Sequence, residues 1–315
     1  MYYHSYVFRM NVLMTRKDAS LAQWRAFLRI AERGSLSAAA KDLGTTQPTV
    51  SRQLKELEHA YGTTLVIRTT RSLRLTDSGK RVYGLAELIV QSDDALRDQL
   101  LGNRTQIEGH LRIAAASGFG AFVVAPFCSR FMERHPKVTI DLRLSDLPVD
   151  LIDEGVDVAV RIGRLSSSSL YAKPLALLEE VLVCHPSCLT RPVTRPADLS
   201  RLAWTGFSGL KNDGAIRLER HGGKYTVKVT PRLRIDQIVG HREALLAGAG
   251  IGMIHRYAVE ADLLAGSLIR LLPDWALPEW PVHAVFPLKT QSHRLQRWLE
   301  EFKAELADVA GVVPK

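Results

Sequence analysis

The feature that most constrains the fold of this 315-residue chain is a series of three closely spaced helical signals in residues 21–60. Apolar residues recur at helical spacing up to Gly34, and a short alanine-rich helix follows that ends at Gly44. Thr46 can cap a third helix, predicted to run to about Ala60. Small alanine side chains and tight glycine turns let such helices pack closely, so the segment predicts a helix-turn-helix.

The third helix has two distinct faces. Val50, Leu54 and Leu57 form an apolar stripe that is expected to pack on the first two helices. Polar and basic residues are predicted on the opposite face, Arg52 and Lys55 among them. An exposed polar helix beside a tight turn is how such motifs contact the major groove of DNA.

A two-stranded wing and a long helix are predicted next. Residues 64–68 and 73–75 are β-prone, and basic side chains lie near the turn between them. Thr76 can cap a helix that extends to about Leu101. Its apolar stripe, which Asp93 interrupts, suggests that it pairs two subunits; docking onto the wing or the next domain is the alternative. The predicted dimerisation residues are Val82, Leu85, Ile89, Leu96 and Leu100.

The pattern changes after residues 102–109, a polar stretch with two glycines that is typical of a hinge. Strands and helices then alternate, which predicts a mostly parallel, helix-flanked sheet, and the length suits two subdomains with a cleft between them. The predicted strands are 111–115, 138–144, 156–162, 180–184, 227–235, 251–255 and 282–286. The predicted helices are 122–134, 149–154, 242–249 and 295–307.

Charge and composition favour an intracellular, nucleic-acid-binding chain. The formal net charge is +9, and residues 1–108 contain 16 lysines and arginines against 11 aspartates and glutamates. No apolar run approaches the ~20 residues of a membrane span, and the N-terminal residues lack a signal-peptide core, so we expect a cytoplasmic protein without a membrane partner. Cys184 and Cys188 are interpreted as a strand and a loop residue, and no metal site is predicted.

Residues 21–79 resemble the DNA-binding domain of LysR-type transcriptional regulators. The segment GSLSAAAKDLGTTQPTVSRQLKELE is similar to the helix-turn-helix of that family, and YGTTLVIRTTRSLRLTDSG to its wing and the start of its linker. Downstream, GHLRIAAASGFG, VDLIDEGVDVAVRIGRL and REALLAGAGIGMI are similar to its effector domain. The resemblance covers about residues 18–305, and the preceding residues have no counterpart in the family pattern.

The resemblance implies a two-domain bacterial regulator: an α+β winged helix-turn-helix with a linker helix, then a two-lobed α/β effector domain like type 2 periplasmic binding proteins. It implies binding of promoter double-stranded DNA, a homodimer that assembles into a homotetramer, contact with RNA polymerase, and a small-molecule effector in the cleft. The predicted parts are an extension (1–18), the DNA-binding domain (19–76), the linker helix (77–101), a hinge (102–109), the effector domain (110–307) and a tail (308–315).

The predicted DNA contacts concentrate on the third helix. Gln47 can pair with adenine and Arg52 with guanine, whereas Lys55 is expected to meet phosphate. Serine caps can offer backbone N–H groups to phosphate, and wing arginines can reach the backbone or minor groove. A merely solvated helix face is the alternative. The full predicted set is Ser35, Ser37, Thr46, Gln47, Pro48, Thr49, Ser51, Arg52, Lys55, Arg68, Arg71 and Arg74.

The predicted effector site lies at strand ends and helix starts around the cleft. Arg161 ends an apolar strand, where it can pair with a ligand carboxylate or with an internal aspartate: Asp146, Asp157 or Asp236. His255 can donate to a ligand or be a structural histidine. Polar and basic candidates favour a small organic acid or an aromatic compound, and no cofactor is predicted. The predicted set is Ser117, Gly118, Phe119, Arg161, Thr205, Phe207, Asp236 and His255.

The sequence disfavours three other classes of protein. An enzyme is disfavoured because the sequence has no G-x-S-x-G, H-E-x-x-H or G-x-x-x-x-G-K-[ST] motif, and the glycines of 248–252 close a helix instead of following a strand. A solute-binding protein would not carry the helix-turn-helix. A different winged-helix regulator, such as a molybdate-responsive one, would not carry the two-lobed domain. No catalytic residue is therefore predicted.

Overall fold

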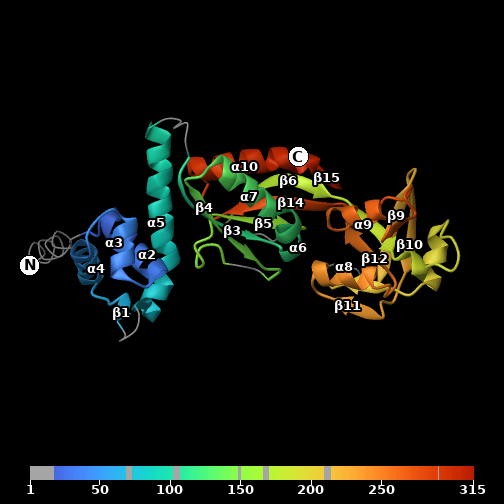
Figure 1. Cartoon of the computed structure of the whole chain (residues 1–315), viewed down its shortest axis with the longest axis horizontal. Helices are drawn as coiled ribbons and strands as arrows, with labels where there is room; N and C mark the ends of the chain where they lie inside the picture. The colour runs from blue at the N-terminus through green and yellow to red at the C-terminus, as the bar shows by residue number, and fades with distance from the viewer. Residues whose placement is uncertain are drawn as a thin grey trace, which may run out of the picture. The chain divides into compact units, whose positions relative to one another are not determined.

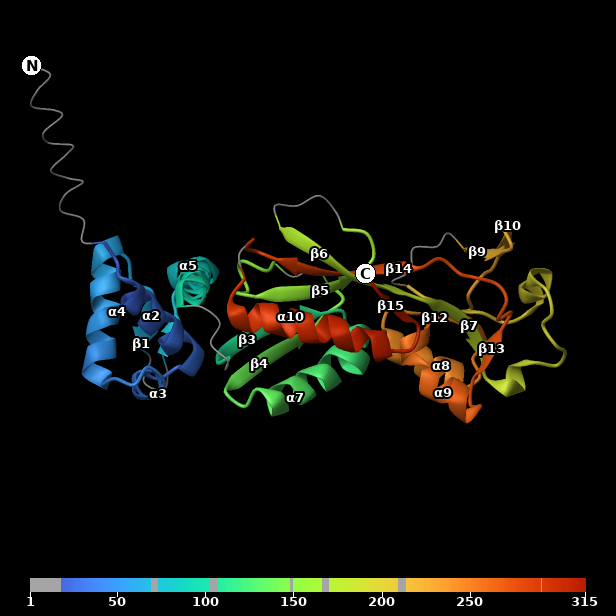
Figure 2. The ribbon, with the colours of Figure 1, turned by 90° about the horizontal axis from the view of Figure 1, so that it is seen from above.

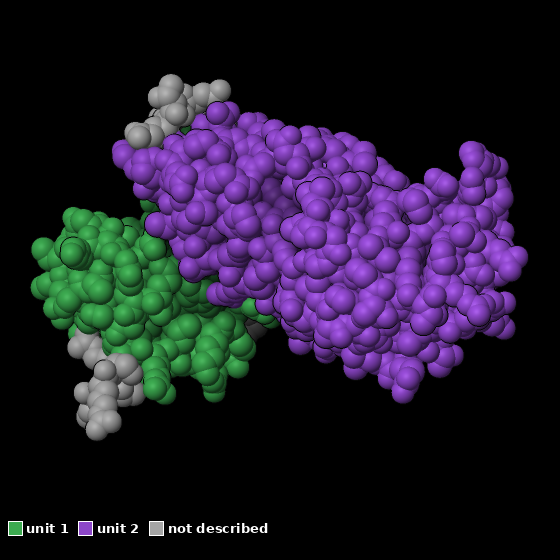
Figure 3. Space-filling view, turned by 45° about the vertical axis from the view of Figure 1, so that its right-hand side comes forward, with its two compact units in different colours: residues 1–103, 152–155 green, residues 104–151, 156–315 purple. Residues whose placement is uncertain are grey.

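The computed structural model describes residues 18–68, 73–101, 107–147, 150–165, 170–208, 214–289 and 291–315. The chain divides into two compact units, one of residues 1–103 with 152–155 and one of residues 104–151 with 156–315 (Figure 3). The predicted extension before residue 18 and most of the predicted hinge lie outside the described residues. None of the helices in the described ranges has the length and apolar character to cross a membrane.

The first unit begins with the three predicted helices. They are α2 (Leu21–Arg33), α3 (Leu36–Asp42) and α4 (Gln47–Tyr61). Ser35 caps α3 and Thr46 caps α4, each through a side-chain oxygen that accepts a backbone N–H. Gly34 and Gly44 adopt positive φ values of 60° in the two turns, a conformation that glycine takes without strain. The helix-turn-helix prediction is thereby confirmed in its elements.

The core of this unit is built from the apolar faces of these helices. Val50 and Leu57 of α4 are fully buried against Phe27 and Ile30 of α2 and Ala39 of α3 in one cluster. The strands β1 (Val66–Arg68) and β2 (Leu73–Leu75) pair antiparallel. The Glu58 carboxylate accepts the N–H groups of Leu65 and Val66, which ties the wing to the end of α4.

The long helix α5 (Asp77–Leu101) begins where Thr76 accepts the N–H of Gly79 at 2.9 Å, as predicted. Its Ala86 is buried in the core of the first unit, and Val82 packs against that core. Asp93, which interrupts the apolar stripe, is explained by two ion pairs: Arg25 of α2 at 3.0 Å and Arg97 at 2.7 Å. One face of α5 therefore packs on the helix-turn-helix. A second face, which carries Leu85 and Ile89, is exposed.

The second unit has two lobes (Figures 1 and 2). The first is built on a six-stranded sheet in the order β15-β6-β14-β5-β3-β4, with α7 and α10 packed together beside it. Its strands are β3 (Gly109–Ala115), β4 (Val138–Leu144), β5 (Val158–Ile162), β6 (Tyr171–Leu178), β14 (Trp280–Phe286) and β15 (Val312–Pro314). Its helices are α6 (Ser117–Phe119), a π-helical turn η1 (Gly120–Val124), α7 (Ala125–Arg134) and α10 (His293–Glu305).

The second lobe contains the sheet β12-β7-β13, the pairs β8–β11 and β9–β10, and the helices α8 and α9. Its elements are β7 (Glu180–Cys184), β8 (Thr205–Phe207), β9 (Ala215–Arg220), β10 (Gly223–Lys228), β11 (Leu233–Ile235), α8 (Ile238–Leu246), β12 (Ile251–His255), α9 (Glu260–Ala265) and β13 (Ile269–Leu271). Along β7, Val181 and Val183 join one core cluster, whereas Leu182 and Cys184 join another. This alternation explains the unbroken apolar run, because a strand covered on both faces needs no polar side.

Four sequence predictions of this domain are wrong. The sheet is mixed, not mostly parallel, because β14 and β6 return antiparallel. The predicted strand 227–235 is two strands in different sheets, β10 and β11. The predicted helix 149–154 is a series of turns in its described residues, ending at Gly155 with a φ of 61°. The predicted tail 308–315 contains β15, which pairs with β6 and belongs to the sheet.

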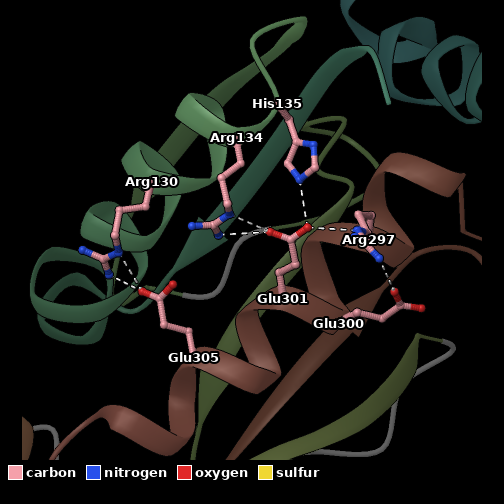
Figure 4. Close-up of polar contacts among 7 residues, drawn as sticks. All are labelled: Arg130, Arg134, His135, Arg297, Glu300, Glu301 and Glu305. Atoms are coloured by element: carbon pink, nitrogen blue, oxygen red, sulfur yellow. Dashed lines mark hydrogen bonds and ion pairs between the residues drawn. The ribbon is translucent and has the colours of Figure 1, made fainter. Parts of the chain in front are cut away.

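Ion pairs join α7 to α10 (Figure 4). Glu301 of α10 accepts hydrogen bonds from Arg134 at 3.0 Å, His135 at 2.8 Å and Arg297 at 2.9 Å, and Arg130 pairs with Glu305. Burial disfavours the charged carboxylate of Glu301, but the bonds from His135 and Arg134 outweigh it and hold its pKa below the ordinary value. Glu301 thus links α10 to the C-terminal end of α7.

We expect Glu301→Gln to lower the free energy of unfolding of this domain by about 1–3 kcal/mol at pH 7, because two guanidinium groups and an imidazole lose their shared carboxylate. Since the folded pKa of Glu301 is depressed, its contribution is present above the unfolded pKa and is lost as the pH falls through the folded pKa. The deficit should therefore shrink toward pH 3. Urea unfolding followed by tryptophan fluorescence measures it. Glu300→Gln is the control, since Glu300 is mostly exposed with a 3.7 Å ion pair; equal effects of the two variants would contradict the prediction.

Candidate nucleic-acid interface and effector cleft

The first site is the exposed face of α4. Its amino-terminal half presents Gln47, Pro48 and Arg52 to solvent, and Lys55 follows one turn later. The Arg52 side chain is 72% exposed, and its Nε lies 3.9 Å from the Glu56 carboxylate. A guanidinium held by one long ion pair can turn to an external acceptor at little cost.

Short hydrogen bonds order the turn that carries this face. The Ser37 hydroxyl donates to the amide oxygen of Gln47 at 3.1 Å, and the Thr46 and Thr49 hydroxyls lie 2.9 Å apart. These bonds orient the Gln47 amide before any ligand binds. Ser37 is the second residue of α3 and not its cap, because Ser35 holds that position.

The structure describes six further side chains of the predicted DNA-binding set. Ser35, Thr49 and Ser51 are half-buried, whereas Ser37, Thr46 and Arg74 are exposed, Arg74 on β2. Arg68 ends β1, but its side chain is outside the described part of the chain, as is the whole of Arg71. The structure therefore collects the α3–α4 residues on one polar, basic surface.

The second site is a cleft of about 200 Å³ in the second unit. The residues that line it lie at or just beyond the carboxyl ends of β3, β4, β5, β8, β11 and β12, with α8 and the start of β14. They are Ala116, Gly118, Phe119, Asp146, Arg161, Ile162, Phe207, Asp236, Ile238, His255, Tyr257 and Trp280. The carboxyl ends of strands are where α/β folds place their ligands.

Six of the eight predicted effector residues line this cleft, and two do not. Thr205 is buried, and its hydroxyl lies 3.0 Å from Nε2 of His241 beside a smaller cavity of about 20 Å³. Ser117 is not among the lining residues, and its backbone N–H donates to Asp146 at 2.8 Å. The structure therefore does not place Thr205 or Ser117 in the lining of the cleft.

Arg161 has backbone partners that the sequence analysis did not consider. Its Nη1 donates to the backbone carbonyls of Ser145 and Leu147, in the turn that follows β4. Asp157 instead accepts the backbone N–H of Arg112 at 2.7 Å. The charge at the end of an apolar strand is therefore accommodated by carbonyl oxygens that the sequence alone does not reveal.

His255 and Tyr257 form an uncharged aromatic wall. The His255 side chain is 5% exposed, and burial lowers its pKa to about 4, so the ring is neutral at physiological pH. Burial, aided by the charge of Asp146, raises the pKa of Tyr257. The two rings stack with centroids 5.6 Å apart, and Trp280 meets the His255 ring edge-on at 6.5 Å.

Sequence reasoning missed six lining residues: Ala116, Asp146, Ile162, Ile238, Tyr257 and Trp280. Of these, Asp146 was considered only as an internal partner of Arg161. Tyr257 lies two residues after the predicted strand 251–255, and Trp280 two before the predicted strand 282–286. Extending the search to residues flanking each strand end would have found both aromatics. Nothing in the sequence indicated which edges of the two lobes face each other.

Gly118 lies where the first lobe contacts α8 of the second lobe. A Cβ built on this residue would overlap with Cγ2 of Ile238, the first residue of α8. Because a β-branched side chain has little freedom to move aside, we expect Gly118→Ala to cost about 1–3 kcal/mol of stability and to widen the cleft.

The test is a double-mutant cycle by urea unfolding with Gly118→Ala, Ile238→Ala and the double variant. If the clash is with Ile238, the double variant will be more stable than the sum of the two single effects implies. Strictly additive effects would show that the added methyl group is tolerated at this contact.

The fold and the two sites define a class: a helix-turn-helix DNA-binding protein fused to a two-lobed domain with a small-molecule cleft. Family models support this assignment in both parts. "Bacterial regulatory helix-turn-helix protein, lysR family" matches residues 21–80, and "LysR substrate binding domain" matches residues 104–307. The chain belongs to the LysR family of transcriptional regulators, which bind DNA and are not enzymes.

Individual regulators of this family are similar to the chain over most of its length. The transcriptional regulator PtxR of Pseudomonas aeruginosa is 31% identical over 89% of this chain and 91% of its own length. The regulator YhjC of Escherichia coli is 32% identical over 90% of this chain and 97% of its own length. The structure of CrgA, a LysR-type regulator from Neisseria meningitidis, matches with a TM-score of 0.55 at 28% identity over 91% of this chain and 99% of that chain.

Proposed function

We propose that this regulator reads promoter DNA with α4 and wing residues as a homodimer joined through α5. The observation that carries the proposal is the division of α4: Val50 and Leu57 are completely buried, while Gln47, Arg52 and Lys55 face solvent. Glutamine and arginine on an exposed helix end suit the major-groove edges of adenine and guanine. Lys55, Arg74 and the N–H groups at the start of α3 suit phosphate.

The dimer part of the proposal rests on the outer face of α5. Leu85, Ile89, Leu96 and Leu100 are between 46% and 77% exposed. They recur at spacings of four, seven and four residues, which places them along one side of the helix. Several exposed apolar side chains on one face of a helix are typical of an interface, whereas a single exposed leucine is not.

The effector part of the proposal is that a small molecule binds the cleft in the second unit and modulates promoter binding. The presence of this cleft supports it. The family relation further supports a homotetramer, contact with RNA polymerase and action in the cytoplasm. It also supports the domain boundaries expected from the sequence, apart from the corrected tail. Light scattering of the full chain measures its mass in solution and so tests the tetramer. Transcription in vitro with purified polymerase measures activation or repression.

The DNA-binding proposal is tested by the salt dependence of affinity. A dimer that neutralises about six to ten phosphates should bind a DNA duplex about 10³–10⁵-fold more weakly at 200 mM salt than at 50 mM. Fluorescence anisotropy with a labelled duplex gives the slope. An affinity that does not change with salt would contradict an interface built on arginine and lysine.

A further inference from the structure

The charges around the cleft do not match an acidic ligand. Its lining carries two carboxylates, Asp146 and Asp236, against one guanidinium, Arg161. His255 lines it as a neutral ring. The Arg161 Nη1 already donates to two backbone carbonyls of the turn after β4. The balance of the lining is therefore negative.

The two carboxylates are open to a new partner. Asp236 forms neither a hydrogen bond nor an ion pair within the described ranges, and it follows β11 in the second lobe. Asp146 follows β4 in the first lobe, and the bond it accepts there comes from the Ser117 N–H through Oδ1. Neither forms an ion pair with a described cation, and each lobe brings one carboxylate to the shared cleft.

Other polar and aromatic groups in the lining suit a cation as well. Nδ1 of His255 is buried and has no hydrogen-bond partner among the described residues, and a neutral imidazole nitrogen can accept a hydrogen bond. Phe207, Tyr257 and Trp280 supply aromatic faces, which attract cations and also cover an apolar body. A buried, unsatisfied nitrogen is costly, so it indicates a ligand that completes it.

We propose that the effector of this regulator is a small organic amine: a protonated amino group held by Asp146 and Asp236, on an apolar or aromatic body packed against Phe207, Tyr257 and Trp280. This inference rests on the proposed function of the cleft as the effector site. The sequence favours a small organic acid or an aromatic compound, and an amine on an aromatic body belongs to the second of these classes.

An amine also gives the cleft a mechanism of closure. With the cleft empty, two like charges on opposite lobes repel each other and favour a wider opening. An ammonium group between them reverses the sign of the interaction and supplies up to three hydrogen-bond donors. Binding and closure of the lobes are then the same event, which is the differential interaction that a regulatory ligand needs.

The test uses three probes that share a phenyl group and differ in the polar head: 2-phenylethylamine, 3-phenylpropionate and 2-phenylethanol. Butylamine and tryptamine vary the apolar body. Calorimetry with the full chain should show an amine binding about tenfold or more tightly than the carboxylate or the alcohol. Asp236→Asn and Asp146→Asn should each weaken the amine by about tenfold, and an amide oxygen at 146 can still accept the Ser117 N–H.

Asp308→Asn is the matched control, because Asp308 is an exposed aspartate of the same domain outside the cleft. Carboxylate binding as tight as amine binding would overturn the proposal. So would the absence of binding by all three amines, or cleft variants that behave like the control. DNA binding of the wild type and of each variant is measured in parallel without ligand. A wild type that does not bind DNA would contradict the proposed function, whereas amine binding tests only the proposed effector class.

Discussion

A variant with Leu85→Asp and Ile89→Asp together is expected to behave as a monomer and to lose most of its promoter affinity. Both side chains lie on the exposed stripe of α5, about half exposed in the single chain. Two carboxylates facing two others across the dimer axis would have to be desolvated without partners, which costs several kcal/mol. Because two helix-turn-helix heads on one dimer bind two half-sites together, the monomer should bind an inverted repeat about 10²–10⁴-fold more weakly.

Light scattering measures the mass, and anisotropy measures the affinity. Leu264→Asp is the control, since Leu264 is an exposed leucine of α9 and its substitution makes the same chemical change elsewhere. Circular dichroism should show that α5 is still helical in the double variant, because its contacts with the head through Ala86 and Asp93 are intact. An unchanged mass would place the dimer interface on another surface.

The second large effect is expected from Arg52→Ala, which should weaken binding to the specific DNA site by about 1–3 kcal/mol. Arg52 is exposed on α4, and its only ion pair with a described residue is the long one with Glu56. No packing is lost on its removal, so the melting temperature should not change. Discrimination should fall with affinity, because a base contact carries sequence information and a phosphate contact does not.

The comparison that isolates the base contact uses two duplexes, the selected site and a scrambled one. Arg220→Ala removes the same charge from an exposed residue of β9 in the other unit, and it should change neither affinity measurably. If Arg52→Ala weakens both duplexes equally, Arg52 contacts phosphate and another residue reads the base.

The helix-turn-helix could be predicted almost residue by residue because its signals are local. Thr46 caps the helix, Pro48 occupies its first turn, and Gly62 ends it with a φ of 63°. Each of these acts on the backbone within a few residues. The apolar stripe of Val50, Leu54 and Leu57 then determines which face of the helix is buried.

The effector domain was less predictable because strand pairing is not local. β15 joins the edge of the sheet through Val312 opposite Leu178, a contact between distant segments that no sequence pattern indicated. The segment 149–154 is too short for its helical pattern to form a helix without strong packing. The cleft aromatics Tyr257 and Trp280 were missed for the same reason, since only the tertiary fold brings their strand ends together.

The most direct test of the central claim is selection of genomic DNA fragments by the purified wild-type chain beside Arg52→Ala. A metabolite extract is included in one arm, so that effector-dependent sites are also sampled. We expect the wild type to enrich promoter fragments that share an inverted repeat, and Arg52→Ala to lose that enrichment. Fragments with no common sequence, or equal enrichment by the variant, would contradict the account of α4 as the element that reads DNA.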